Sequence, residues 1–154
     1  MRWCEEYEWC DDCGICEEIF EEGKRYGESI GMHNRELGAR GEQVAARYLR
    51  LRGYEILERN WVCPSGEADI IARDGDYLVF IEVKTRAHSE KGLPEEAVDA
   101  KKRARYENIA GWYLIDFDGS DIPMRFDVIS VMVLNDERAM LRHHVDAFGE
   151  GGCL

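Results

Sequence analysis

The chain has no apolar run long enough to cross a membrane. Its longest uncharged stretches, such as YLVFI and VISVMVLN, are far shorter than the roughly 20 apolar residues that a membrane-spanning helix needs. No basic, apolar, small-residue signal peptide opens the chain, and it contains neither an internal repeat nor a low-complexity tract. We therefore expect a cytoplasmic protein with no membrane partner.

Positive charge is also scarce. The sequence has 20 Lys and Arg against 32 Asp and Glu, a formal net charge of −12, which argues against indiscriminate binding of polyanions. The deficit is uneven, because residues 1–31 hold 10 acids and 3 bases, whereas the remaining residues hold 22 acids and 17 bases. Local patches, and not the total charge, therefore decide which partners bind.

Residues 1–31 do not fit the rest of the chain. They form an acidic extension with four crowded cysteines, Cys4, Cys10, Cys13 and Cys16. One interpretation is a second metal site, because closely spaced thiolates can bind zinc or an iron–sulfur cluster. The other is a mis-assigned start, with translation beginning at Met32 just before a good helix N-terminus, or a disordered segment.

Residues 32–154 are the size of one domain, and the 45% apolar content of the chain suffices for an ordinary core. Periodicity and turn residues predict an α/β domain with the element order αβββαββ. The predicted helices cover residues 34–52 and 94–115, and the predicted strands cover 54–62, 67–73, 77–84, 126–134 and 139–148.

The stretch GEADIIARDGDYLVFIEVKTR reads as a hairpin with charges among its apolar residues. If Gly75 and Asp76 form its loop, Asp69 faces Glu82 across the two strands. Glu67 then faces Lys84, and a loop shifted by one residue keeps all four side chains on the same face. That face also carries Ile71, Leu78 and Phe80, so part of it must be covered. We expect the first helix to cover it.

Two facing carboxylates repel each other, and partial burial makes the repulsion stronger. A divalent cation held by Asp69 and Glu82 would offset it, and oxygen ligands suit Mg²⁺ or Mn²⁺. The alternative is a surface ladder in which Lys84 pairs with Glu67 and solvent screens the rest. Residues 32–154 offer no compact set of zinc ligands, because the neighbouring His143 and His144 would point to opposite faces of a strand.

These residues resemble the PD-(D/E)xK nuclease signature, an acid on one strand followed by E-x-K on the next. The segments LGARGEQVAARYLRLRGYEILERNW, GEADII, FIEVKTR, EEAVDAKKRAR and RFDVISV together resemble the YraN-like family of that superfamily. The resemblance spans about residues 34–148, although Ala68 stands where the superfamily name has proline. It implies a restriction-endonuclease-like three-layer core, a mixed sheet flanked by helices, and a nuclease-like domain over residues 32–154.

The resemblance also implies roles for individual residues. Asp69 and Glu82, with the Val83 carbonyl, would bind Mg²⁺ or Mn²⁺, and Lys84 would orient or deprotonate the attacking water or neutralise charge on the phosphate. Glu42 matches an acid that the first helix of related nucleases adds to the metal site. Its alternative interpretation is a solvated helix glutamate.

A basic cluster on the second predicted helix is the candidate phosphate-binding surface. Lys101 and Arg105 share a face at i and i+4, with Lys102 and Arg103 on its flanks, although such charge runs are often solvated. Arg86 and Lys91, just past the E-x-K strand, are their natural companions. Trp112 and Tyr113 could stack on bases, but their place near a helix end favours the core.

Three functions follow from these observations. The first is a Mg²⁺-dependent nuclease that hydrolyses DNA phosphodiester bonds, with branched, nicked or single-stranded DNA as the candidate substrate. The second is a nucleic-acid-binding accessory module without significant catalysis. The third is a metal- or redox-responsive accessory protein acting through the N-terminal cysteines.

Overall fold

The computed structural model describes residues 34–87, 100–117, 121–134 and 139–148. The N-terminal cysteines, Lys91 and the predicted start of the second helix at residue 94 lie outside these ranges. The elements are α2 (Asn34–Leu51), β1 (Glu55–Cys63), β2 (Gly66–Asp74), β3 (Tyr77–Ala87), α3 (Ala100–Ile115), β4 (Met124–Val133) and β5 (Ala139–His144).

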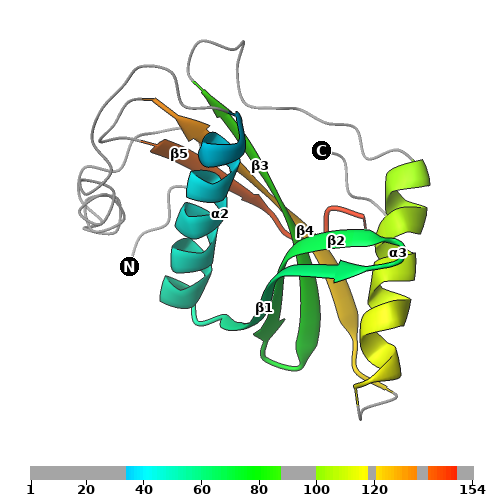
Figure 1. Cartoon of the computed structure of the whole chain (residues 1–154). Helices are drawn as coiled ribbons and strands as arrows, with labels where there is room; N and C mark the ends of the chain where they lie inside the picture. The colour runs from blue at the N-terminus through cyan, green and yellow to red at the C-terminus, as the bar shows by residue number, and fades with distance from the viewer. Residues whose placement is uncertain (1–33, 88–99, 118–120, 135–138, 149–154) are drawn as a thin grey trace.

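The five strands form one mixed sheet in the order β1-β2-β3-β4-β5, shown in Figure 1. All neighbours are antiparallel except β3 and β4, which run parallel. A parallel pair needs a crossover connection, and α3 lies in that connection. The order αβββαββ confirms the α/β class and architecture expected from the sequence.

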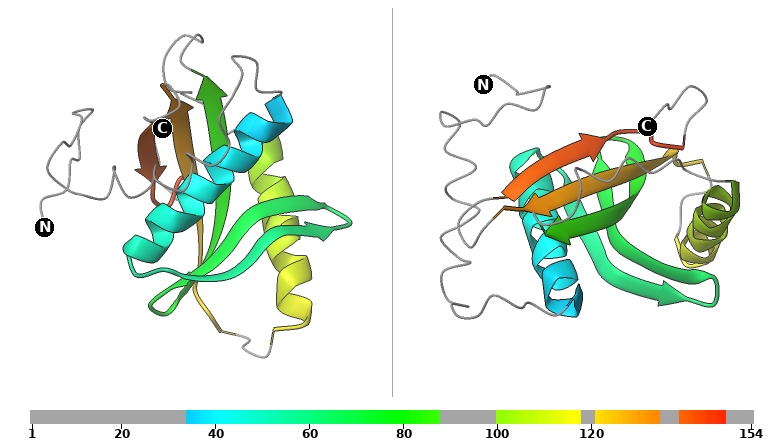
Figure 2. Two further views of the ribbon diagram at one scale, coloured as in Figure 1. Left: turned by 60° about the vertical axis from the view of Figure 1, so that its left-hand side comes forward. Right: turned by 90° about the horizontal axis from the view of Figure 1, so that it is seen from above.

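The two helices cover opposite faces of the sheet (Figure 2). Apolar residues of α2, including Val44 and Leu49, pack with the face that contains Ile70, Val79 and Ile81. The opposite face packs against Tyr106, Ile109 and Ala110 of α3 and contains Ala68, Ile71, Leu78, Phe80 and Val128. Both faces are thus buried, which gives three layers.

The expectation that the first helix covers the face of Ile71, Leu78 and Phe80 is wrong, because α3 covers it. Side-chain alternation assigned these residues to one face but could not tell which helix would lie against them. The crossover between β3 and β4 decides this point, and it places α3 on that face. Ala68 also packs in the α3 cluster.

The hairpin register agrees with the sequence. Asp74 pairs with Tyr77 and Ile70 with Ile81, so Gly75 and Asp76 form the two-residue loop. Gly75 has φ +58°, a left-handed conformation that glycine adopts without strain. The expected facing residues Asp69 and Glu82 lie immediately beyond the last of these ladder pairs.

The last strand is shorter than predicted. β5 ends at His144, and a turn in which Asp146 has φ +53° replaces the expected strand up to residue 148. Ala147 and Phe148 are nevertheless buried in the α3 cluster, so their apolar character reflects packing after the turn. Neither described helix is long and apolar enough to span a bilayer.

Candidate functional site

Asp69 lies where β2 and β3 stop pairing. Its Oδ2 accepts a hydrogen bond from the backbone N–H of Val83 at 2.7 Å. The side chain of Asp69 thus takes a hydrogen bond that the ladder would otherwise supply, and this fixes the carboxylate beside the segment Glu82–Lys84. This hydrogen bond links β2 to β3 at the E-x-K segment, where the sequence predicted the site.

Glu82 is the centre of a small charged cluster. The Nζ of Lys84 lies 3.7 Å from its Oε1, and the Nζ of Lys102, from α3, lies 3.2 Å from the same oxygen. The side chains of all three residues are less than one-fifth exposed, so solvent screens these charges weakly. The cluster therefore joins the sheet to the N-terminal part of α3.

The environment of the cluster shifts the pKa values of its groups. Burial raises the pKa of Asp69 to about 6, against the effect of the Val83 N–H, and the negative charges of Glu42 and Glu82 add to the rise. Burial, followed by the contact with Lys102, lowers the pKa of Lys84 to about 8. An acid that resists ionisation and a lysine that loses its proton readily are typical of functional sites.

Glu42 is brought to the site by close packing of α2 on β3. A Cβ atom on Gly41 would lie 2.7 Å from the Cβ of Thr85, so only glycine lets the helix approach at this point. The charge of the adjacent Glu42 contributes to the raised pKa of Asp69. Gly41 thus lies close against β3, whereas no atom of the described residues lies within 4 Å of a Cβ added to Gly38.

We expect Gly41→Ala to lower the free energy of unfolding by about 1–3 kcal/mol, because the new methyl group would overlap Thr85. Gly38→Ala is the matched control in the same helix. It should raise the free energy of unfolding by up to about 1 kcal/mol, because alanine favours the helix. Urea unfolding followed by circular dichroism measures both, and equal changes would contradict the close approach.

The predicted phosphate-binding residues separate into two groups. Lys101 and Arg105 of α3 are exposed, as the sequence suggested. Lys102 is largely buried and contacts Glu82. Arg86 is partly buried and lies two residues after Lys84 on the same strand, so it shares that residue's face.

Comparison with known sequences shows the family to which the chain belongs. The profile described as "Uncharacterised protein family UPF0102" matches residues 41–131, more than half of the chain. The chain belongs to the UPF0102 family. This YraN-like family is part of the restriction-endonuclease-like superfamily, which confirms the resemblance noted in the sequence.

Individual relatives match over most of their own length. A UPF0102 protein of Beutenbergia cavernae is 45% identical over 107 residues, which cover 70% of this chain and 91% of the relative. A UPF0102 protein of Rhodococcus jostii is 45% identical over 116 residues, 75% of this chain and 98% of the relative. A UPF0102 protein of Geobacter sulfurreducens is 42% identical over 116 residues, 75% of this chain and 91% of the relative.

Two members of the site in this UPF0102 chain had no such role in the sequence interpretation. Lys102 was expected only as a phosphate-binding residue on the flank of the helix, and the structure adds its ion pair with Glu82. Tyr106, one turn further along α3, is buried; burial raises its pKa, and the charges of Glu82 and Asp69 add to this. The i, i+4 spacing of Lys102 and Tyr106 places them on one side of the helix, and this spacing is the sequence feature that could have indicated their shared position.

The donor atoms around Asp69 and Glu82 determine whether a divalent cation fits there. No three His, Cys, Asp or Glu side chains in the described ranges form a ready-made metal cluster. The Oε2 atom of Glu82, however, is buried without a hydrogen-bond partner among the described residues. A buried carboxylate oxygen without a partner, beside a second acid with a raised pKa, fits a site that a cation completes.

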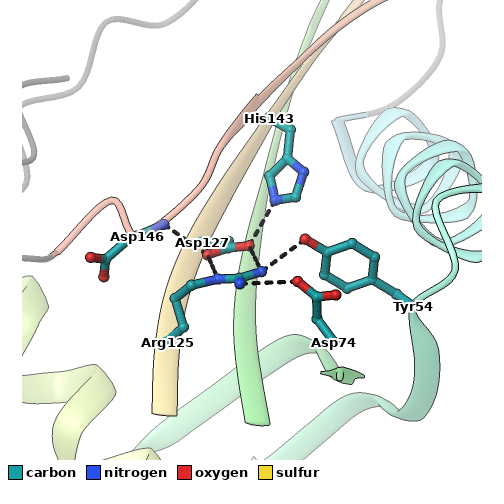
Figure 3. A network of polar contacts seen from close by, with 6 residues as sticks. All are labelled: Tyr54, Asp74, Arg125, Asp127, His143 and Asp146. Atoms are coloured by element: carbon teal, nitrogen blue, oxygen red, sulfur yellow. Dashed lines mark hydrogen bonds and ion pairs between the residues drawn. The ribbon is translucent and has the colours of Figure 1, made fainter. Parts of the chain in front are cut away.

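A second polar cluster lies toward the β2–β3 turn, at the other end of β3 (Figure 3). Asp127 of β4 is 1% exposed and accepts hydrogen bonds from Arg125 Nε at 2.9 Å and from the Asp146 N–H at 2.9 Å. His143 Nε2 lies 2.8 Å from its other oxygen. Arg125 also donates to the hydroxyl of Tyr54, the residue before β1, so the cluster joins the start of β1 to β4, β5 and the turn that follows β5.

Proposed function

We propose that this protein is a divalent-metal-dependent nuclease that hydrolyses DNA phosphodiester bonds. The observation that carries the proposal is the grouping of Asp69, Glu82 and Lys84 where β2 and β3 separate. Membership of the restriction-endonuclease-like superfamily supports the same reaction class. Binding a phosphate alone would not need two neighbouring acids, so the arrangement favours catalysis over simple phosphate binding.

Asp69 and Glu82 would hold Mg²⁺ or Mn²⁺, with the Val83 carbonyl and Glu42 as further ligands. A bound cation supplies Lewis acidity toward the phosphate and lowers the pKa of water. Lys84, with its pKa lowered to about 8, is suited to accept a proton from the attacking water or to neutralise charge on the phosphate. Lys102 keeps Glu82 in place through its ion pair.

Cleavage of a defined panel tests the proposal. Blunt, nicked, flapped, branched and single-stranded DNA, with RNA counterparts, would be incubated with Mg²⁺, Mn²⁺ or EDTA. We expect the parent to cut at least one DNA and both Asp69→Ala and Lys84→Ala to cut it at least about 100-fold more slowly, because each removes a group that acts on the reacting atoms.

Asp76→Ala, a change at the exposed hairpin loop, is the control and should cut like the parent. Equal rates for all four proteins would identify a contaminating nuclease and contradict the proposal. If the parent cuts no substrate with either metal, the nuclease proposal fails, and an accessory module that binds nucleic acid becomes the better explanation.

A further inference from the structure

One stripe of α3 is exposed along its whole length. Residues at spacings of 4, 3, 4 and 3 fall on one side of a helix, and the fourteen steps from the first to the last span roughly 21 Å. In α3 this stripe consists of Lys101, Arg105, Asn108, Trp112 and Ile115, all of them exposed. It is cationic near the candidate site and apolar at its far end.

Trp112 is the unusual member of this stripe. The sequence favoured a core position, which is wrong, because the side chain is 44% exposed and lies outside the apolar cluster that includes Tyr113. Its indole Nε1–H donates to Ser65 Oγ at 3.1 Å. The hydrogen bond holds an exposed aromatic ring in a fixed position, which reduces the entropy lost when a planar group stacks on it.

The end of the β1–β2 hairpin borders the stripe (Figure 1). A Cβ on Gly66 would lie 3.6 Å from the Cδ of Arg105, so the stem of this arginine lies against the hairpin. Its guanidinium carbon is 5.3 Å from the centre of the Tyr106 ring. Arg105 is therefore held between the hairpin and the core, with its charge on the stripe.

The charges of the stripe favour an anionic partner. None of its five residues is acidic, and Glu107 lies away from the stripe, 4.0 Å from Arg103. Among the described residues, the exposed acids at its borders include Glu67, beside Gly66, and Asp116, just past the helix end. Lys102, which follows Lys101 in the chain, contacts Glu82, so the cationic end of the stripe begins at the candidate site.

We propose that this stripe binds an unpaired segment of the DNA strand held at the candidate site. Lys101 and Arg105 contact successive phosphates, and a base stacks on Trp112. Stacking needs an exposed base face, which a strand inside a duplex does not offer. The inference rests on the proposed nuclease function and narrows its substrate to DNA in which a duplex meets a single-stranded segment.

Binding without cleavage tests this assignment. In EDTA, fluorescence anisotropy would compare a blunt duplex, the same duplex with a six-thymine tail at either end, and the tailed duplex with abasic spacers in the tail. We expect the full-length parent to bind one tailed duplex at least about tenfold more tightly than the blunt and abasic forms, because base stacking contributes only to the thymine tail.

Two substitutions separate stacking from charge. Trp112→Ala should reduce the affinity for the tailed duplex about 5- to 100-fold without changing the salt dependence, and Trp112→Phe should retain most of the affinity. Arg105→Ala should weaken binding to every DNA and make the salt slope shallower by about one. Arg50→Ala, an exposed change at the end of α2, serves as the charge control and should leave both quantities as in the parent.

Equal binding of tailed, abasic and blunt duplexes, no measurable binding of any of them, or no effect of Trp112→Ala would overturn the assignment. Thermal unfolding of each variant shows whether it is folded. If Trp112→Ala is not folded, Trp112→Phe tests whether an aromatic ring at this position contributes to binding. Because the assay contains no metal and measures no cleavage, failure of the nuclease proposal would appear separately, in the cleavage panel.

Discussion

Asp127→Ala is expected to lower the free energy of unfolding by about 3–5 kcal/mol at pH 7. The Asp127 side chain is fully buried and pairs with Arg125 and His143. Its removal leaves buried donors of both residues, and the Asp146 N–H, without their acceptor. Losing one member of a buried network costs more than the net strength of its bonds, because the remaining groups stay desolvated.

The loss should depend on pH. Burial alone would raise the pKa of Asp127, but the hydrogen bonds from His143, Arg125 and the Asp146 N–H hold it below its usual value. A depressed pKa in the folded state adds stability above the unfolded value of about 3.9, and that stability is lost as the pH falls through the folded pKa. The difference between parent and variant should therefore shrink below about pH 4.

Ser130→Ala is the matched control on the same strand. Ser130 is buried, and its hydroxyl has no hydrogen-bond partner among the described residues. Its removal should change the free energy of unfolding by less than about 1 kcal/mol or raise it. Urea unfolding across pH 3–8 measures both variants, and similar losses for the two would contradict a dominant role for the Asp127 network.

The hairpin and its acids were predictable because they depend on local rules. Strand alternation and a two-residue glycine turn fix the register, and the observed pairs of Asp74 with Tyr77 and Ile70 with Ile81 follow it. The same rules placed Asp69 next to the Glu82–Lys84 segment. The element order followed from periodicity for the same reason, since each element carries its own pattern.

The contacts between elements could not be predicted in this way. The pairing of Lys102 with Glu82 and the exposure of Trp112 both depend on how α3 is rotated against the sheet. A charge run and an aromatic near a helix end fit several rotations equally well. The Asp127 network brings together residues that are far apart in the chain. Tyr54 contacts Arg125, 71 positions later, and His143, 89 positions later. No local sequence pattern marks such contacts.

Asp69→Asn is expected to stabilise the protein in the absence of divalent cations. At pH 8 in EDTA, the free energy of unfolding should rise by about 1–3 kcal/mol, because the parent must ionise a carboxyl group whose pKa is raised to about 6 by burial. The amide oxygen of asparagine can still accept the hydrogen bond from the Val83 N–H. The substitution removes the charge and keeps the shape.

The pH dependence of this gain has a defined direction. The folded pKa of Asp69, about 6, lies above the unfolded value of about 3.9, so the folded state holds more protons between these values. Stability of the parent therefore falls as the pH rises through this window. The advantage of Asp69→Asn should be near zero at about pH 4 and complete above about pH 7.

Divalent cations should reverse the order of stability. A cation bound only by the folded parent adds about 4.1 kcal/mol at about 1,000 times its Kd, which exceeds the advantage of the variant, whereas Asp69→Asn lacks the second carboxylate that would hold the cation. Asp76→Asn, the same chemical change at the exposed loop, should shift stability by less than about 0.5 kcal/mol with or without metal. Thermal unfolding with EDTA, Mg²⁺ or Mn²⁺ measures all three proteins. If Asp69→Asn is less stable than the parent in EDTA, burial does not raise the pKa of Asp69 as expected. If Mg²⁺ and Mn²⁺ leave the stability of the parent unchanged, Asp69 and Glu82 do not hold a cation.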